Sequence, residues 1–386
     1  MKIGVLGVSC TKFGEHWDKS LSDLLWLSQI EALNDAKISP KDLDLILVGN
    51  MCSGIFLGQQ NLGVVAAENL NVNIPSFTVE SACASGGVAL RSGIISILSG
   101  TSDLVLVSGV EKMTDVNISQ ATTGLMFAAS EELEAFNGAT FPSLNGMVAR
   151  SYMHKYGLTR EQLASVSVKN HRHGALNTLA HLRKEISIAD VLNSQIVSDP
   201  LTLLDCSPVS DGAASIILCS EKFAPKNDKK LVSIIGFGMA MDSLSLQNRE
   251  DLCSMKATKL ASEIAYKSAG VEPKDIDVVE LHDAFSILEI IALEDLGFAE
   301  KGEAGRLEAE GKFNIDSDGL VVNPSGGLKA KGHPIGATGV SQAVEIVKQL
   351  RGSCDKNQVK DANLGLAHNM GGVGASVTVH IFKRED

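Results

Sequence analysis

A stretch of nineteen residues occurs twice in this chain, in related form. Residues 32–50, ALNDAKISPKDLDLILVGN, align without a gap to residues 265–283, AYKSAGVEPKDIDVVELHD. Each copy is typical of a helix followed by a Pro-Lys-Asp turn and an apolar strand. The repeat therefore predicts a duplicated unit, with two halves of the same fold. The identical positions are Ala32, Ala36, Pro40, Lys41, Asp42 and Asp44 in the first copy and Ala265, Ala269, Pro273, Lys274, Asp275 and Asp277 in the second.

The elements expected after each copy follow a similar order. In the first half they are a helix, a strand, a helix and a strand at residues 60–70, 75–79, 83–98 and 103–109. In the second half they are a helix, a glycine-rich loop, a helix and a strand at residues 287–296, 323–327, 334–350 and 363–369. Strands that alternate with helices predict a parallel or mixed sheet covered by helices. Two such units side by side predict a five-layered α/β/α/β/α fold.

The duplication divides the 386 residues into an N-terminal half, residues 1–222, and a C-terminal half, residues 223–386. Residues from about 112 to 222 have no obvious place in the repeat. We expect this insertion to fold as a loop subdomain, because structureless loops of such length are uncommon in compact proteins. It is also where we look for substrate binding, since binding residues concentrate on such connections.

Composition and charge disfavour several classes of protein. The formal net charge of −12, from 34 basic and 46 acidic residues, argues against nucleic acid and anionic membranes as general partners. No apolar stretch approaches the roughly 18 residues that a membrane span needs, and the N-terminus lacks a signal-peptide pattern, so we expect a cytoplasmic protein. Seven cysteines without any CxxC spacing argue against a disulfide framework and a structural zinc site.

One stretch is basic despite the acidic total. Residues 169–184, KNHRHGALNTLAHLRK, include Arg172 and Arg183 together with lysines and three histidines. A ligand that carries phosphate groups would need such a local patch. The alternative is a solvated helix and loop without a ligand, which charge alone favours.

The segment ESACASGGVAL, residues 80–90, places Cys83 where a strand-like run gives way to a helix-like one. At the first turn of a helix, unpaired backbone N–H groups and the helix dipole stabilise a thiolate and lower its pKa. The glycines that follow allow close approach of a ligand or of backbone. Cys83 is therefore a candidate nucleophile. The alternative is a buried structural cysteine, which is the better interpretation of the other six cysteines.

The segment NPSGGLKAKGHPIGATG, residues 323–339, surrounds His333 with glycines, among them Gly326 and Gly327. Because so many glycines cost backbone entropy, they indicate that the backbone passes close to something, and we expect Gly326 and Gly327 to contact substrate. His333 takes roughly the place in the second half that Cys83 takes in the first, so a pseudo-twofold axis would bring the two helix starts together. A histidine commonly activates a thiol and can also donate to a developing oxyanion.

Two further strands end in histidines. In VVELHDAFS, residues 278–286, the strand ends at His282 and Asp283, and in LAHNMGGVGAS, residues 366–376, it ends at His368. Ligands of α/β sheets bind beyond the carboxyl ends of the strands, so both segments point to one site. Asp283 by itself is also typical of a turn. We expect no metal ion, because a lone cysteine with dispersed histidines lacks metal-ligand spacing.

With these segments in view, the chain resembles the thiolase superfamily. SACASGG looks like the nucleophile loop, VSGVEKM (107–113) like the segment on the following strand, SDGAAS (210–215) like the Asp-Gly-Ala run and GHPIGATG like the catalytic histidine loop. The resemblance covers essentially the whole chain, in order. The His-Asp-Ala-Phe run at 282–285 and the His-Asn pair at 368–369 resemble sterol-carrier-protein-type thiolases and, more closely, archaeal acetoacetyl-CoA thiolases.

The resemblance implies an acetyl-CoA C-acetyltransferase, which joins two acetyl-CoA molecules in a ping-pong reaction with coenzyme A thioesters as substrates and no other cofactor. Cys83 would carry the acetyl group, His333 would activate Cys83, and His282 would donate to the enolate oxygen. A second oxyanion hole would come from backbone N–H groups of Cys83 and of the turn formed by Gly371 and Gly372. Phe285 would wall the acyl pocket.

The chain departs from the common thiolases in one respect. Those enzymes use a second cysteine to move the methyl proton, whereas this chain has Ala284 and no cysteine in the last loop. We hypothesise that His368, or less favourably Cys52, takes that role. Two alternatives remain open: a degradative 3-ketoacyl-CoA thiolase, which would accept chains longer than four carbons, and a catalytically weak scaffold that binds acyl-CoA for a partner synthase.

The resemblance also implies partners. Thiolases are homodimers or homotetramers, and archaeal members assemble with hydroxymethylglutaryl-CoA synthase and a small zinc-ribbon/OB-fold protein, which feeds the mevalonate route to isoprenoids. The basic stretch at 169–184, with Arg172 and Arg183, becomes a candidate for binding the phosphates of coenzyme A.

Overall fold

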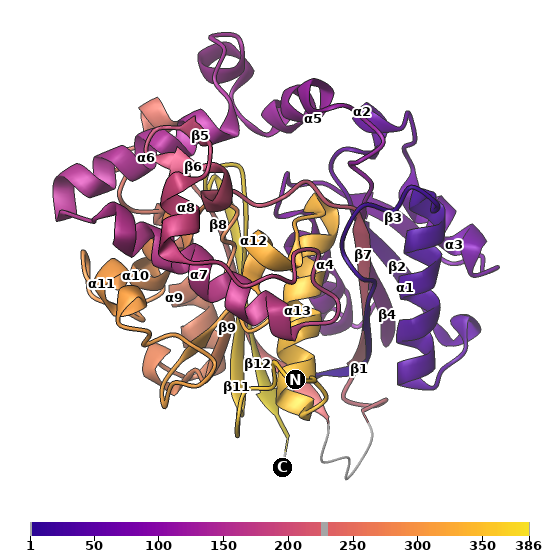
Figure 1. The fold of residues 1–386 in the computed structure, drawn as a ribbon. Coiled ribbons are helices and arrows are strands. Elements are labelled where there is room, and N and C mark those ends of the chain that lie inside the picture. Colours follow the sequence, from indigo (N-terminus) through magenta and orange to yellow (C-terminus); the bar gives the residue numbers. More distant parts are fainter. Residues whose placement is uncertain (1, 225–230, 386) are drawn as a thin grey trace.

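Ten strands form one sheet in the order β10-β9-β11-β12-β8-β1-β7-β4-β2-β3 in the computed structural model, which describes residues 2–224 and 231–385 (Figure 1). The first half of the chain supplies β1 Ile3–Cys10, β2 Leu45–Gly49, β3 Ser76–Val79, β4 Leu104–Glu111 and β7 Gly212–Ser220. The second half supplies β8 Val232–Met241, β9 Val278–Glu280, β10 Val321–Val322, β11 Leu364–Gly371 and β12 Ser376–Arg384. This is the predicted α/β fold.

The two halves have the same strand topology. The order β3-β2-β4-β7-β1 in one half corresponds to β10-β9-β11-β12-β8 in the other. In each half the three strands at the outer edge are parallel to one another, the fourth strand pairs antiparallel with the third, and the fifth pairs antiparallel with the fourth. The halves join where β1 pairs antiparallel with β8 over three residue pairs, so the two expected sheets are continuous with each other.

Two helices lie between the half-sheets, and further helices cover their outer faces (Figure 1). The central pair, α4 Ser85–Leu98 and α13 Ile335–Arg351, pack against each other, and α13 contacts β4 and β7 of one half as well as β11 of the other. Outside the sheet, α1 Leu21–Ala36 packs on β1 and β7, and α9 Lys256–Ala269 packs on β8 and β12. The predicted five layers are therefore present. The other helices of the two halves are α2 Ser53–Phe56, α3 Leu62–Asn69, α10 Ser286–Asp295, α11 Ala304–Ala309 and α12 Gly327–Lys331.

The repeated alanines make the same contact in both halves. A Cβ atom added to Gly7 on β1 would lie 2.2 Å from the carbonyl oxygen of Ala32 on α1, and one added to Gly236 on β8 would lie 2.5 Å from that of Ala265 on α9. Small residues on both surfaces thus let each outer helix lie directly on the first strand of its half.

The repeated aspartates also have matching partners. Asp44 accepts a hydrogen bond from the backbone N–H of Leu104 at 2.9 Å, and Asp277 accepts one from the backbone N–H of Leu364 at the same distance. Each aspartate therefore holds the start of the neighbouring parallel strand, β4 in one half and β11 in the other. The sequence identities of the repeat correspond to structural contacts at these positions.

The insertion lies between β4 and β7. It extends over the end of the sheet at which α4 and α13 begin (Figure 1). It ends earlier than predicted, because residues 212–220 form the fully buried strand β7, which pairs with β1 and β4. Within the two described ranges, no helix combines the length and the apolar character that crossing a bilayer requires. The elements of the insertion are α5 Ile118–Leu125, α6 Phe141–Tyr156, α7 Arg160–Leu176, α8 Ile188–Asn193, β5 Ile196–Ser198 and β6 Leu201–Thr202.

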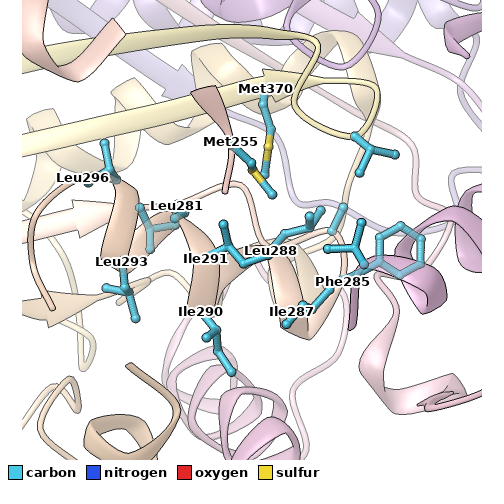
Figure 2. Close-up of a cluster of buried hydrophobic side chains, with 14 of the residues drawn as sticks. Met255, Leu281, Phe285, Ile287, Leu288, Ile290, Ile291, Leu293, Leu296 and Met370 are labelled. Atoms are coloured by element: carbon cyan, nitrogen blue, oxygen red, sulfur yellow. The ribbon is translucent and has the colours of Figure 1, made fainter. Parts of the chain in front are cut away.

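Helix α10 is buried along its whole length and anchors the segment that precedes it. Its apolar side chains meet those of the sheet and of α9 in one cluster, which Figure 2 shows around Ile287, Leu288 and Ile291. The helix also contacts α6 and α7 of the insertion. The helix is enclosed on every side, with its apolar side chains in this cluster and its buried Glu289 paired with Lys169 at 2.9 Å, so it fixes residues 281–285 at the end of β9.

Because α1 and α9 lie directly on β1 and β8, one methyl group added at either contact should lower the stability of the protein strongly. Gly7→Ala and Gly236→Ala should each lower the free energy of unfolding by about 1–3 kcal/mol, because the new Cβ would overlap backbone that cannot move away freely. Gly319→Ala is the matched control, since no atom lies within 4 Å of the added Cβ. Denaturant unfolding of the three variants measures the difference, and equal stabilities would contradict the contact.

Candidate active site

Cys83 lies in a tight turn between β3 and α4. Ala82 has a left-handed backbone with φ of 51°, which is strained for a residue other than glycine. The turn is held by Ser85, whose hydroxyl accepts from the backbone N–H of Ser81 at 2.9 Å and donates to the carbonyl oxygen of Ala82 at 2.6 Å. Cys83 stands two residues before the first residue of α4, not within its first turn as predicted.

The structure brings Cys83, His282 and His333 together, as predicted for Cys83 and His333 from the pseudo-twofold relation and for His282 from its place at the end of a strand. Sγ of Cys83 and one ring nitrogen of each histidine all lie within 4.8 Å of one another. The two rings meet edge to face, with 4.9 Å between their centroids. His333 stands two residues before α13, as Cys83 does before α4. These three donors are also close enough to hold a metal ion, which their spacing in the sequence did not indicate.

Glycines of the two motifs let α4 and α13 touch at their starts. A Cβ atom on Gly86 would lie 2.8 Å from the carbonyl oxygen of Gly336, and one on Gly339 would lie 2.3 Å from the backbone nitrogen of Gly87. The close approach that the glycines predict is therefore between the two central helices. It sets the separation of Cys83 and His333.

His333 is neutral and arranged to accept a proton. Its Nδ1 lies 2.7 Å from the hydroxyl of Thr338, and that hydroxyl donates its own hydrogen to the carbonyl oxygen of Pro334 at 2.9 Å. Nδ1 of His333 must then be the protonated nitrogen, which leaves the lone pair on Nε2. Burial lowers the pKa of His333 to about 3, so the ring is neutral, with a single N–H, at neutral pH.

Cys83 is a protonated thiol in the resting protein. Burial raises its pKa to about 12, and the nearby Glu111 adds to the shift, although backbone N–H groups of Gly372 and of Cys83 itself hydrogen-bond the sulfur and oppose it. The sequence predicted a lowered pKa from the helix dipole. That prediction is wrong because desolvation of the thiolate outweighs the dipole here. Cys83 therefore needs a base to become a nucleophile.

His368 faces away from Cys83, contrary to the hypothesis that it moves the methyl proton. Its Nε2 lies 3.1 Å from the hydroxyl of Thr258 on the outer helix α9. Successive side chains of a strand point to opposite faces of the sheet. It is therefore the next residue of β11, Asn369, that points toward the site, where its amide donates to the carbonyl oxygen of Cys83 at 3.1 Å.

Cys52 lies in the same buried cluster as Cys83, together with Met113 and Ile335. Burial raises its pKa, and the charges of Glu111 and Cys83 raise it further. The thiol is thus a weak acid whose conjugate base is strongly disfavoured, which makes Cys52 a poor proton carrier.

Glu111 is a site residue that the sequence reasoning did not single out, although its motif VSGVEKM was noticed. The carboxylate is buried and accepts from the backbone N–H groups of Cys52 at 3.1 Å and of Gly336 at 3.1 Å. It thereby joins the loop after β2 to the start of α13. Burial raises its pKa to about 7. The signal in the sequence that could have indicated it is an acidic residue directly after the mostly apolar run 104–110, within that motif.

The residues expected to contact substrate have different surroundings. Gly371 and Gly372 line an open hollow of about 310 Å³ beside the Cys83 turn, together with Ala82 and Phe127. Phe285 directly precedes α10 and packs at the edge of the apolar cluster in Figure 2. Gly371 and Gly372 therefore have free space on one side, whereas Phe285 is part of the core.

Gly326 and Gly327 contact protein and not open space, which corrects their predicted contact with substrate. A Cβ atom on Gly326 would lie 2.7 Å from Cα of Gly174, and one on Gly327 would lie 2.5 Å from the carboxylate of Asp283. Asp283 accepts from the backbone N–H of Leu328 at 2.6 Å. Glycines are needed here because α12 begins against a buried carboxylate and against α7.

The basic stretch 169–184 is largely structural. Lys169 is buried and forms an ion pair with Glu289 at 2.9 Å. Arg172 forms an ion pair with Asp316 at 3.0 Å, which offsets the charge that a phosphate would need. Arg183 lies exposed beyond the end of α7. The expected solvated helix is therefore wrong for the buried part of the stretch, and of the two arginines only Arg183 is without an ion pair among the described residues.

Comparison with known proteins identifies the family. Residues 3–222 match the family model "Thiolase, N-terminal domain", and residues 238–384 match "Thiolase C-terminal domain-like". The chain belongs to the thiolase family. As a thiolase it is an acyltransferase. Its geometry, with a cysteine and histidines at the starts of two equivalent helices, agrees with this assignment.

Several relatives match this thiolase over nearly its whole length. It is 49% identical to the acetyl-CoA acetyltransferase of Methanothermobacter thermautotrophicus, over 99% of each chain, and 46% identical to that of Methanocaldococcus jannaschii, over 98% of each. It is 34% identical to human sterol carrier protein 2, with 99% of this chain aligned to 72% of that protein. A solved structure described as an Ltp2–ChsH2(DUF35) aldolase has the same fold, with a TM-score of 0.85, 24% identity and 98% and 97% of the two chains covered.

The protonated state of Cys83 can be measured directly. Because only the thiolate is alkylated, the rate of Cys83 modification by iodoacetamide should rise about tenfold for each pH unit from 7 to 10, without levelling off near the ordinary thiol pKa of ~8.5. Peptide mass spectrometry separates Cys83 from the other cysteines, with Cys354 as a partly exposed internal comparison. A plateau at or below pH 8 would show that the thiolate is stabilised instead.

Proposed function

We propose that this thiolase is an acetyl-CoA C-acetyltransferase, which condenses two acetyl-CoA molecules into acetoacetyl-CoA and free CoA. The observation that carries the proposal is the cluster of Cys83, His282 and His333, whose donor atoms lie within 4.8 Å of one another. The names of the two archaeal relatives, at 49% and 46% identity, support the substrate. Coenzyme A thioesters are the substrates, and the reaction requires no further cofactor.

In the first half-reaction His333 acts as the base. Nε2 of His333 takes the proton of the Cys83 thiol as the sulfur attacks the carbonyl carbon of acetyl-CoA. The bond between that carbon and the sulfur of CoA then breaks, and the leaving thiolate takes the proton from His333. His333 is neutral again, and the acetyl group remains on Cys83.

Backbone and side-chain donors stabilise the developing oxyanions. The backbone N–H groups of Gly372 and Cys83, which lower the pKa of the Cys83 thiol in the resting protein, would receive the oxygen of the acyl group on Cys83. His282 supplies the donor for the second acetyl-CoA, whose enolate oxygen would lie between the two histidine rings. Negative charge develops on the substrate oxygens as each reaction step proceeds, so these donors stabilise the transition state more than the ground state.

In the second half-reaction we propose that His333 acts as the base again, since His368 points to the other face of the sheet. His333 removes a methyl proton from the second acetyl-CoA, and the resulting carbanion attacks the acetyl carbon on Cys83. The bond from that carbon to the cysteine sulfur breaks, and the thiolate of Cys83 takes the proton back from His333. One base in two successive steps thus replaces the second cysteine of common thiolases.

We further propose that the protein acts as a homodimer or homotetramer at the start of an isoprenoid (mevalonate) pathway, in a complex with hydroxymethylglutaryl-CoA synthase and a zinc-ribbon/OB-fold protein. The family resemblance supports the pathway and the partner proteins. Apolar side chains on the edge strand β3 and on α4, Phe77 and Ile95, are 49% and 41% exposed, which supports an interface between copies of the chain.

Cleavage of acetoacetyl-CoA by the purified protein in the presence of CoA tests the reaction in its reverse direction. The wild type should cleave it, and Cys83→Ala should lose at least about 10³-fold in kcat, because the acyl-enzyme cannot form. A wild type that becomes acetylated on Cys83 but does not cleave would favour the scaffold alternative. Faster cleavage of 3-ketohexanoyl-CoA than of acetoacetyl-CoA would favour the degradative alternative.

The assignment of the base predicts unequal effects of two histidine substitutions. His333→Ala should lower kcat by about 10²–10⁴-fold, because it removes the proton acceptor. His368→Gln keeps a partner for Thr258 and should leave kcat within about threefold of the wild type, since no proton passes through it. Steady-state condensation and cleavage rates of both variants give the answer, and comparable losses in the two would restore His368 as the second acid/base.

A further inference from the structure

Asn369 is buried on β11 and joins three parts of the active site. Its Nδ2 lies 3.1 Å from the carbonyl oxygen of Cys83 and 3.1 Å from Nδ1 of His282. Its Oδ1 lies 3.2 Å from the backbone nitrogen of Gly87 on α4. The residue therefore connects the nucleophile turn, the first central helix and one of the two histidines.

Two of these partners fix which way the amide of Asn369 points. The backbone N–H of Gly87 can only donate, so the side-chain atom that faces it must be the oxygen. The carbonyl oxygen of Cys83 can only accept, so the atom that faces it must be the nitrogen. The second hydrogen of Nδ2 is then directed at His282.

The amide in turn determines the tautomer of His282. Nδ1 of the ring receives an N–H, so it must carry the lone pair, and the proton of the neutral ring must be on Nε2. A lone pair on Nδ1 excludes the doubly protonated ring, in agreement with the effect of burial, which lowers the pKa of His282. His282 thus presents an N–H donor to the site, whereas His333 presents a lone pair.

This tautomer also bears on metal binding. A divalent cation held by Cys83, His282 and His333 would need the lone pair on Nε2 of His282. The ring proton would then move to Nδ1 and face the N–H of Asn369, which places two donors against each other. Histidines that bind metals usually donate their other N–H to a carboxylate or a carbonyl oxygen, which is the opposite arrangement.

We propose that Asn369 is the positioning residue that holds His282 as a hydrogen-bond donor and thereby keeps the cluster of Cys83, His282 and His333 from binding a divalent cation. The donor role in catalysis rests on the proposed acetyltransferase function, whereas the exclusion of metal does not. Exchange of the amide for a carboxylate reverses the hydrogen bond, because a carboxylate accepts from Nδ1–H and leaves the lone pair on Nε2.

Cobalt(II) titration tests the exclusion of metal without any turnover. Asn369→Asp should bind Co²⁺ at least about tenfold more tightly than the wild type. The reason is that the new carboxylate accepts a hydrogen bond from Nδ1–H of His282 and leaves the lone pair of Nε2 free for the metal. Binding is read from the near-ultraviolet thiolate-to-cobalt absorption band under anaerobic conditions. The double variant Cys83→Ser with Asn369→Asp should lose this band, because the sulfur ligand is gone. Equal affinity of the wild type and Asn369→Asp, or a band that survives in the double variant, would overturn the proposal.

A second variant covers the case in which a carboxylate beside the carbonyl oxygen of Cys83 prevents folding. Asn369→Leu has nearly the same shape and removes the opposing N–H without adding an acceptor. Thermal melting establishes that each variant is folded before titration. Asn369→Leu should bind Co²⁺ more tightly than the wild type and less tightly than Asn369→Asp, and an affinity unchanged from the wild type would overturn the proposal.

Kinetics in the presence of a chelator test the donor role separately. With metal removed, Asn369→Leu and Asn369→Asp should lower kcat for acetoacetyl-CoA cleavage by about 10²-fold with little change in KM, because a lost oxyanion donor acts on the transition state. Unchanged kcat together with tighter Co²⁺ binding would overturn the donor role. Absence of cleavage by the wild type would refute the proposed function, while the titration would still decide the exclusion of metal.

Discussion

The direct contact between the starts of α4 and α13 is the constraint on which the site depends. Gly86 and Gly336 leave no room for a Cβ atom between the two helices. Each helix carries a functional residue two positions before its start, so the contact sets the distance between Cys83 and His333. Glu111 holds the same junction from the side of β4 through the backbone N–H of Gly336.

Enclosure between two half-sheets gives Cys83, His282 and His333 an uncharged resting state. Burial raises the pKa of Cys83 to about 12 and lowers that of His333 to about 3, so neither the thiolate nor the imidazolium is present before substrate binds. A neutral thiol and two neutral histidines in opposite tautomers then divide the work. One ring accepts a proton and the other donates a hydrogen bond, and the hydroxyl of Thr338 and the amide of Asn369 maintain the difference.

Much of this arrangement could be predicted from the sequence, because the signals of the duplication can be read within short segments. Ala36 and Ala269 occupy the same place in the two halves, and the Cβ of each would lie 2.7 Å from a Cβ added to the facing glycine of the first strand, so the shared alanine follows from a shared contact. Cys83, His282 and His333 were predicted from strand ends and glycine-rich turns, which are visible in short segments. His368 was misplaced, because a difference of one residue along β11 decides which side chain faces the site, and the sequence pattern did not fix that register.

The sequence by itself determined the α/β class, the two-fold repetition and the residues that follow the strand ends. It could do so because periodicity, small residues and turns are properties of neighbouring positions. Only the tertiary structure decided the protonation of the site. Whether a thiol is ionised, which nitrogen of His282 carries the proton and which side chain of β11 reaches it depend on burial and on partners more than 80 residues away, such as Asn369 for His282. Desolvation and hydrogen bonds across the half-sheets, not local sequence, set these states.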